Sequence, residues 1–308
     1  MAGRLQVVGE RLEYAGEEVW LRGVATGDPV LGRAGRPASD YQEIAQVWGA
    51  NTVRFGIHPG IWMDNDPAIV LDRLADEADA ALSEGLFVII DWHAIGWPDG
   101  PFLEAPGLAA NTYDSTFDLA MGFWDQVAYM FGDEGRVLFE LWNEPAAIDP
   151  EWDEEPAWEA LKPFWEQLLG VIRQHGDNVV IASSGNYTYD LRGVRRSPLR
   201  GGNVAYAWHV YAGHSNNDPR LWAQMLDDVQ TVAPVVVTEW GFQRGAQAHF
   251  NGTSEGFGNP FVYEFLEGRA LHSTAWCWHP VWGPPMVEDD WRTPNEFGHF
   301  VQRYLRGV

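Results

Sequence analysis

The stretch Val235-Val-Val-Thr-Glu-Trp-Gly241 is an apolar run that ends in a carboxylate. The β-favouring residues before Glu239 predict a strand, and Gly241 begins a loop, so this carboxylate stands at the C-terminal end of the strand. Earlier in the chain, Val137-Leu-Phe-Glu-Leu-Trp-Asn143 repeats the pattern and is followed directly by Glu144. Strands that end in polar groups are typical of α/β folds, whose sites form at one end of the sheet.

Working outward, β-rich apolar runs alternate with segments of helical spacing along the whole chain. The predicted strands are residues 19–25, 51–57, 86–93, 136–143, 178–184, 203–211, 234–239 and 273–278. The predicted helices are residues 67–84, 117–131, 156–175, 219–232 and 294–305, whereas residues 187–200 read as irregular. Residues 5–9 and 11–14 predict a short hairpin before them. This alternation predicts a (β/α)8 TIM barrel with a short N-terminal β-hairpin.

The length of 308 residues suits one closed α/β barrel. We find no low-complexity linker and no repeat of 20 to 50 residues. We therefore expect residues 1–308 to form a single catalytic domain. The sequence carries no signal that specifies an oligomeric state.

The charge is strongly acidic, with 44 Asp and Glu against 20 Lys and Arg, a formal net charge of −24, and Lys162 as the one lysine. Such a surface repels nucleic acid and anionic membranes, so neither is expected as a partner, and neutral substrates fit better. The scarcity of lysine beside a persisting arginine content favours adaptation to high salt, where ions screen the self-repulsion.

Cysteine usage and the N-terminus limit the remaining classes. The single cysteine, Cys277, excludes an intramolecular disulfide framework, and its apolar surroundings indicate a buried structural thiol. No run of 18 apolar residues occurs, and Met1-Ala-Gly-Arg-Leu-Gln6 does not resemble a secretion signal. Two localisations stay open: cytoplasmic, or secreted with the signal absent from this sequence.

Polar and aromatic clusters coincide with the C-terminal ends of the predicted strands. They are Arg54, Asp91 with His93, Asn143 with Glu144, His209 with Tyr211, Glu239, and Trp276 with Trp278. In a (β/α)8 barrel these ends converge on one mouth. The sequence therefore predicts a single site there.

Two strand-end glutamates are the residues that acid-assisted cleavage of a glycosidic bond requires. The apolar run before Glu144 predicts a partly desolvated carboxyl with a raised pKa, which suits a general acid. Glu239 would be the nucleophile, kept ionised by Arg54 and Tyr211. Glu140 shares strand parity with Glu144 and is interpreted as a buried supporting carboxylate.

Tryptophan is abundant, with 17 residues, and indole faces stack on sugar rings. Several tryptophans lie in predicted loops rather than at periodic core positions, and some of these are expected to line a saccharide groove. They are Trp62, Trp97, Trp152, Trp282 and Trp291.

These residues together resemble glycoside hydrolase family 5, a family of retaining barrel glycosidases. The resemblance runs from Leu21-Arg-Gly-Val24 through Asn51-Thr-Val-Arg54, Asp91-Trp-His93, Trp142-Asn-Glu-Pro145, His209-Val-Tyr211 and Thr238-Glu-Trp-Gly241 to Ala275-Trp276. It implies Glu144 as acid/base and Glu239 as nucleophile. It further implies that Asn143 binds the sugar 2-hydroxyl and that Arg54 and Tyr211 orient Glu239.

The resemblance also implies that His93 and His209 contact the substrate or Glu144. Trp276 would floor the subsite beside the scissile bond, although Trp278 has the same parity and could take that place. The implied mechanism is double displacement, with the two carboxyl groups about 5 to 5.5 Å apart. No metal and no organic cofactor is expected, and no His-x-His or His-Glu-x-x-His pairing occurs.

The expected substrate is a polysaccharide or oligosaccharide, and endo-β-1,4-glucanase activity leads. Endo-β-1,4-mannanase is a close alternative because both preferences share the residues above. Exo-acting β-glucosidase or β-1,3-glucanase activity is open if the loops at 98–112 or 244–260 wall off one end of the groove. A carbohydrate-binding barrel without hydrolysis fits poorly with the presence of both glutamates.

Overall fold

The computed structural model describes residues 3–31, 33, 36–100, 109–146, 157–247 and 249–307. Trp152, Pro156 and most of the predicted loop at 98–112 lie outside the described residues.

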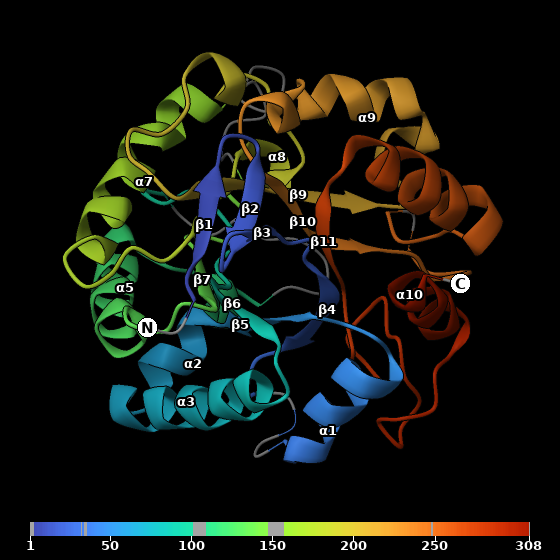
Figure 1. Cartoon of the computed structure of the whole chain (residues 1–308), viewed down its shortest axis with the longest axis horizontal. Helices are drawn as coiled ribbons and strands as arrows, with labels where there is room; N and C mark the ends of the chain where they lie inside the picture. The colour runs from blue at the N-terminus through green and yellow to red at the C-terminus, as the bar shows by residue number, and fades with distance from the viewer. Residues whose placement is uncertain are drawn as a thin grey trace.

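Eight parallel strands form a closed barrel, which confirms the predicted (β/α)8 fold (Figure 1). In chain order they are β4 (Arg22–Gly27), β5 (Thr52–Ile57), β6 (Phe87–Trp92), β7 (Val137–Glu140), β8 (Val180–Ala182), β9 (Val204–Tyr211), β10 (Val235–Gly241) and β11 (His272–Ala275). Each pairs with its sequence neighbours, and β11 closes the ring on β4. Every strand residue except Arg22 is buried, as expected for a parallel sheet covered on both faces.

Two strands end three residues earlier than predicted, and both differences lie at the mouth. β7 stops at Glu140, and Asn143 then donates its backbone N–H to the carbonyl of Trp92 at 2.9 Å. β11 stops at Ala275, because the backbone N–H of Cys277 bonds the carbonyl of Pro284 at 2.9 Å and draws the chain out of the sheet.

Helices surround the barrel. The longer ones are α3 (Pro67–Ser83), α5 (Phe117–Phe131), α7 (Trp158–Ile172), α9 (Pro219–Leu226) and α10 (Glu296–Arg306). The shorter helices are α1 (Ala38–Gln42), η1 (Glu43–Val47), α2 (Pro59–Asp64), α4 (Ala110–Tyr113), α8 (Gly185–Thr188), η2 (Val194–Arg196), η3 (His214–Asn217), η4 (Val229–Thr231) and η6 (Glu267–Arg269). Asp66 caps α3 and Thr116 caps α5 by accepting backbone N–H bonds from the first turn.

Two predicted boundaries between helix and loop were wrong. The helix predicted at 219–232 ends at Leu226, because Asp227 and Asp228 adopt left-handed conformations that no α-helix continues through. The loop predicted at 244–260 contains the start of a π-type helix, η5 (Ser254–Leu266), whose glycines and Pro260 hide its helical spacing.

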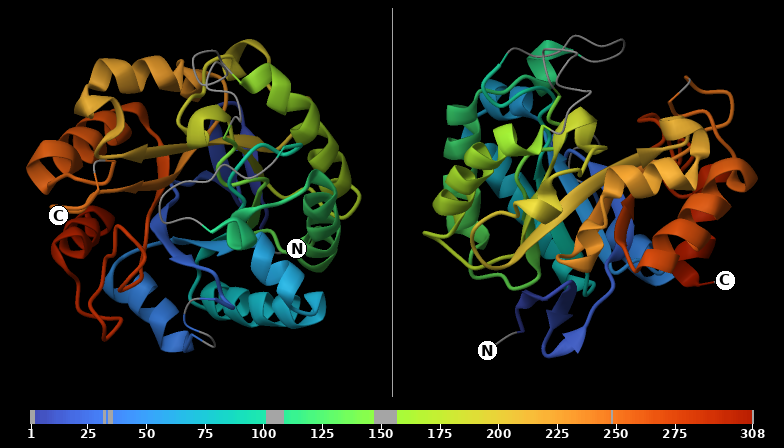
Figure 2. Two further views of the ribbon diagram at one scale, coloured as in Figure 1. Left: turned by 180° about the vertical axis from the view of Figure 1, so that it is seen from behind. Right: turned by 90° about the horizontal axis from the view of Figure 1, so that it is seen from above.

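The N-terminal segment is a three-stranded antiparallel sheet rather than the predicted two-stranded hairpin. It comprises β1 (Leu5–Val8), β2 (Arg11–Tyr14) and the added β3 (Glu17–Glu18). Leu5 and Leu12 are buried in one cluster with Phe87, Leu138 and other residues near the N-terminal ends of the barrel strands. Figure 2 shows this sheet projecting from one end of the barrel, so the opposite end is left for a site.

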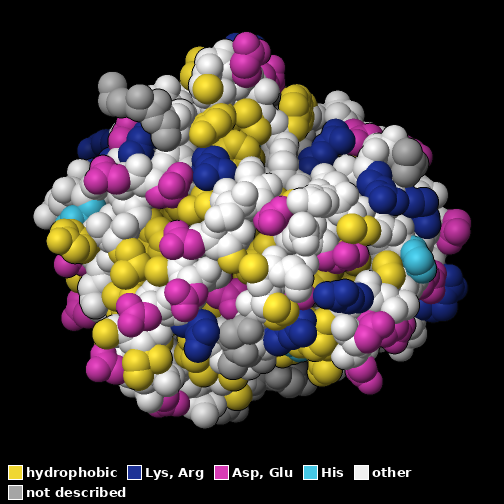
Figure 3. All heavy atoms as spheres, turned by 60° about the horizontal axis from the view of Figure 1, so that its bottom comes forward, with side chains coloured by type: hydrophobic (Ala, Val, Ile, Leu, Met, Phe, Trp, Pro, Cys, Tyr) yellow, Lys and Arg dark blue, Asp and Glu magenta, His cyan; other side chains and the backbone are white. Residues whose placement is uncertain are grey.

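The surface mixes both signs of charge. On the face in Figure 3, acidic side chains are spread among separate groups of Lys and Arg rather than gathered in one patch. Within the described part of the chain, no helix combines the length and the apolar character needed to cross a membrane.

Candidate active site

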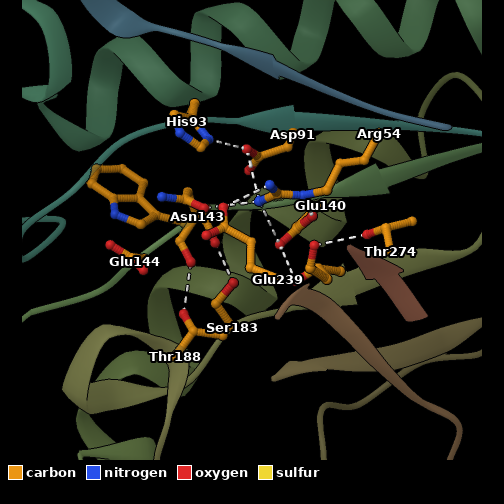
Figure 4. Close-up of polar contacts among 12 residues, drawn as sticks. Arg54, Asp91, His93, Glu140, Asn143, Glu144, Ser183, Thr188, Glu239 and Thr274 are labelled. Carbon is orange, nitrogen blue, oxygen red and sulfur yellow. Dashed lines mark hydrogen bonds and ion pairs between the residues drawn. The ribbon is translucent and has the colours of Figure 1, made fainter. Parts of the chain in front are cut away.

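All eight candidate residues lie at the mouth of the barrel, where the C-terminal strand ends converge. Figure 4 shows Arg54, His93, Asn143, Glu144 and Glu239 close together there. They come from six different strands or the loops that follow them. β5 carries Arg54, β9 carries His209 and Tyr211, β10 carries Glu239, and His93, Asn143, Glu144 and Trp276 follow β6, β7 and β11. Residues far apart in the sequence are thus placed within hydrogen-bond distance of one another.

Arg54 is the centre of the site and is fully buried. Its Nε and Nη2 donate to both oxygens of Glu140 at 2.6 and 3.1 Å, and Nη2 also lies 2.9 Å from Oδ2 of Asp91. Burial lowers the pKa of Arg54, but the carboxylates of Asp91, Glu140 and Glu239 outweigh it and raise that pKa well above its usual value. One guanidinium therefore holds three carboxylates in place.

Glu239 receives a hydrogen bond on each oxygen. Nη1 of Arg54 donates to Oε1 at 2.8 Å, and the hydroxyl of Tyr211 donates to Oε2 at 2.5 Å. Burial and the nearby Glu239 carboxylate raise the pKa of Tyr211 well above its usual value, so the phenol keeps its proton for this bond. These two donors hold the carboxyl group of Glu239 in one orientation.

Glu144 and His209 form a second polar pair. Oε1 of Glu144 accepts from Nδ1 of His209 at 3.0 Å, and Nε2 of His209 bonds the hydroxyl of Thr238 at 3.0 Å. Burial lowers the pKa of His209, but Glu239, Glu140 and Glu144 raise it to about 9. Burial raises the pKa of Glu144, as the sequence predicted, against the opposing charge of His209. Glu144 is the more accessible carboxyl, with 16% of its side chain exposed against 6% for Glu239.

Backbone bonds fix the loop that carries Glu144. Its N–H donates to the carbonyl of Ala94, and its own carbonyl accepts from Gly96, both at 3.0 Å. The hydroxyl of Thr188 donates to the carbonyl of Asn143 at 2.6 Å. Oδ1 of Asn143 accepts from Arg54 at 2.8 Å, which turns the amide NH2 group away from Arg54.

Trp276, rather than Trp278, faces the mouth. Its ring stacks on His93 with centroids 5.1 Å apart and planes within 9°. Trp278 is fully buried and packs edge-on against Trp48. His93 contacts Asp91 through Nδ1 at 2.6 Å, and burial lowers its pKa well below the usual value, so its imidazole is neutral.

The loop tryptophans divide into core and site residues. Trp62 lies in α2 and packs on Phe123, and Trp97 is buried in the same large core cluster, so the loop assignment did not predict their burial. Trp291 packs beneath Arg33 and Arg36. Trp282 stays partly exposed and lies parallel to Trp276, with centroids 6.4 Å apart.

Further residues complete the site. Thr238 donates its hydroxyl proton to Glu140 at 2.9 Å, so Nε2 of His209 must be the donor to Thr238. Asp28, His58 and Tyr113 also reach the mouth, and the sequence reasoning passed over them. His58 does stand at the end of a predicted strand, and that position was the available signal.

The described residues contain one group with metal-ligand spacing, formed by Glu144, His209 and Glu239, whose ligand atoms lie within 4.8 Å of one another. With a pKa of about 9, His209 carries a proton on both ring nitrogens and bonds Glu144 and Thr238 through them. Both ring nitrogens are thus engaged in hydrogen bonds within the site. The group formed by Glu144, His209 and Glu239 is therefore suited to binding and transferring protons.

The sequence of this chain is similar to those of known proteins. A family model described as cellulase, glycosyl hydrolase family 5, matches residues 12–281. Endoglucanase E-5 from Thermobifida fusca is 28% identical over 251 residues, 78% of this chain and 48% of that protein. Endoglucanase A from Evansella cellulosilytica is 28% identical over 195 residues, 63% of this chain and 36% of that protein. The chain thus spans about half the length, or less, of these curated relatives.

A solved structure resembles the whole fold. The crystal structure of β-glucanase SdGluc5_26A from Saccharophagus degradans is 25% identical with a TM-score of 0.90, covering 100% of this chain and 94% of that one. The same β-glucanase in complex with cellotetraose matches equally well.

Proposed function

We propose that this chain, which belongs to glycosyl hydrolase family 5 and is a cellulase-type glycoside hydrolase, is a retaining endo-β-1,4-glucanase. Glu144 and Glu239 would be its catalytic pair. The observation that carries the proposal is their separation. A carboxylate oxygen of Glu144 lies within 4.8 Å of one of Glu239. A short spacing suits double displacement, since inverting pairs stand roughly 6.5–9.5 Å apart to admit a water.

In the first half of the reaction, Glu239 attacks the anomeric carbon and forms a glycosyl ester. Glu144 gives its proton to the departing glycosidic oxygen, and the new carboxylate forms beside the cationic His209 at 3.0 Å. In the second half, Glu144 takes a proton from water, whose oxygen displaces Glu239 and restores the original configuration. Arg54 and Tyr211 hold Glu239 ionised as nucleophile and as leaving group.

The remaining residues position the sugar. The NH2 group of Asn143 would donate to the 2-hydroxyl, and the face of Trp276 would carry the sugar ring beside the scissile bond. His93, oriented by Asp91, would accept from a sugar hydroxyl through Nε2. We further propose that residues 1–308 act as one catalytic domain, because the N-terminal sheet packs under the barrel strands.

The choice of β-glucan rests on the relatives. Two curated relatives are endoglucanases, and the β-glucanase of the same fold is solved with cellotetraose. Salt adaptation rests on the excess of 44 acidic over 20 basic residues.

The deciding experiment measures reducing-sugar release from carboxymethyl-cellulose, barley β-glucan, laminarin and glucomannan at low and molar salt. We expect hydrolysis of carboxymethyl-cellulose and barley β-glucan by the wild type, and loss of it in Glu144→Ala and Glu239→Ala. Glu288→Ala removes an exposed glutamate and serves as the control that keeps activity. Cleavage of glucomannan alone would make the enzyme a mannanase, and cleavage of laminarin alone would make it a β-1,3-glucanase.

The mechanism has its own test. Proton NMR during the first minutes of cello-oligosaccharide hydrolysis should show the β-anomer of the new reducing end before mutarotation. Azide added to Glu144→Ala should yield the β-glycosyl azide, and azide added to Glu239→Ala the α-azide. An initial α-anomer from the wild type would contradict retention.

A further inference from the structure

Two aspartate–histidine pairs lie side by side at the mouth. One is Asp91 with His93, described above. In the other, Nδ1 of His58 lies 2.9 Å from Oδ2 of Asp28, which also accepts the backbone N–H of His58 at 2.9 Å. The two imidazole rings meet edge to face with centroids 4.7 Å apart. The second pair joins the residues that follow β4 and β5, adjacent strands of the barrel.

The hydrogen bonds of Asp28 decide how His58 is presented. Oδ1 of Asp28 accepts the backbone N–H groups of Val30 and Leu31 at 2.7 and 3.0 Å. A carboxylate in such a nest only accepts, so Nδ1 of His58 is the donor, which leaves Nε2 as the ring nitrogen that can accept. Asp91 has no such nest, but the Oδ2 atom that meets Nδ1 of His93 at 2.6 Å also accepts from Nη2 of Arg54 at 2.9 Å, so we infer that Nδ1 of His93 is likewise the donor.

These two Nε2 atoms have no protein partner among the described residues, although His58 is only 2% and His93 only 4% exposed. Buried polar groups normally find a partner, so a pair of unused acceptors indicates a ligand that donates. Two such acceptors, on rings whose centroids lie 4.7 Å apart, suit neighbouring hydroxyl groups on one sugar ring.

Aromatic side chains enclose this pair. Tyr113 packs on His58 and His93 at 5.1 and 6.0 Å, and burial together with the charges of Glu144 and Glu239 raises its pKa to about 12. Trp282 lies 5.7 Å from His58. We call His58, His93, Tyr113, Trp276 and Trp282 the histidine cage. Its flat aromatic faces and its hydrogen-bonding edge are those that a glucosyl unit requires.

We propose that His58 is a specificity-determining residue, which accepts a hydrogen bond from a hydroxyl of the glucosyl unit stacked on Trp276, with Asp28 as its positioning residue. This inference rests on the proposed function and deepens it. An acceptor of this kind selects sugars with a free hydroxyl at that position and discriminates against deoxygenated or O-alkylated ones.

Binding to a slow variant tests the inference apart from turnover. In a Glu144→Gln background, cellotetraose affinity is measured by calorimetry with His58 intact and with His58→Phe, which keeps the ring and removes the acceptor. We expect about 10- to 100-fold weaker binding in His58→Phe, partial recovery in His58→Gln, and an intermediate loss in Asp28→Asn. His299→Phe, on an exposed face of α10, is the matched control and should bind like its parent.

A series of monodeoxy cello-oligosaccharides identifies the hydroxyl. Removal of one particular hydroxyl should weaken binding to the parent variant and leave binding to His58→Phe unchanged. Removal of any other hydroxyl should weaken binding to the two variants equally. Equal cellotetraose affinity with and without His58, in variants with the parent's melting temperature, would overturn the inference. So would a deoxy series that shows no dependence on His58. Failure of the proposed function shows separately, as wild-type enzyme that binds cellotetraose without cleaving it.

Discussion

At the scale of single residues, the site depends on how buried charges compensate one another. Arg54 contacts Asp91, Glu140 and Glu239 with its side chain fully buried. Burying ions costs free energy that only close partners offset, so the removal of one partner leaves the others uncompensated. Arg54, which bonds the proposed nucleophile Glu239, is therefore also expected to stabilise the fold.

Arg54→Met should lower the free energy of unfolding by about 3–5 kcal/mol, because buried carboxylates lose their counter-charge. Urea unfolding at pH 7 followed by fluorescence measures this loss. Arg200→Met, on the surface, should change stability by about 0.5 kcal/mol or less. An Arg54→Met protein as stable as the wild type would show that Asp91 and Glu140 take up protons without cost.

His209 makes stability depend on pH. Its pKa rises from 6.5 to about 9 in the folded protein. The stabilisation is therefore complete below about pH 6.5 and is lost as the pH rises through about 9. Unfolding free energies measured from pH 6 to 10 should fall more steeply in the wild type than in His209→Gln. Parallel curves for the two proteins would contradict a cationic His209.

At the scale of elements, the barrel separates stability from chemistry. The N-terminal sheet seals one end through Leu5 and Leu12, while the strand ends at the other end carry the candidate site. A change in the sheet should therefore act on stability alone.

Leu12→Ala should cost about 2–5 kcal/mol of unfolding free energy, because it opens a cavity beneath the barrel. Its kcat and KM, measured well below the melting temperature, should match the wild type. Val8→Ala, at a side chain that is 41% exposed, is the control and should be nearly neutral in both respects. A large change of kcat in Leu12→Ala would mean that the two ends of the barrel are coupled.

At the scale of the whole molecule, the formal charge of −24 dominates. Repulsion among like charges opposes the compact state, and the Debye length falls from about 10 Å at 0.1 M salt to about 3 Å at 1 M. Salt should therefore stabilise this protein.

The melting temperature and the proposed activity on β-glucan should both hold or increase from 0.1 M to 2 M sodium chloride. Potassium chloride should have the same effect, since the effect is one of screening. A charge-reduced variant, with exposed glutamates changed to glutamine, should gain less stability from added salt. Loss of structure or activity at molar salt would refute the salt adaptation.

The sequence by itself determined the barrel and the candidate pair. Strand periodicity and strand ends are local properties, and a barrel brings every C-terminal strand end to one mouth, so Arg54, Glu144 and Glu239 could be grouped without coordinates. Helical spacing likewise located α3, α5 and α7, whose apolar stripes are long and uninterrupted.

Only the tertiary structure decided what depends on contacts beyond the local pattern. The alternation of side chains along a strand could not show whether Trp276 or Trp278 faces the mouth, because the backbone leaves the sheet at Cys277 to bond Pro284. The burial of Trp62 and Trp97 depends on their packing in the large core cluster, such as the contact of Trp62 with Phe123. The pairing of Asp28 with His58 exists because β4 and β5 are neighbours in the ring. Such contacts join residues through space, and a one-dimensional pattern does not encode which side chains meet.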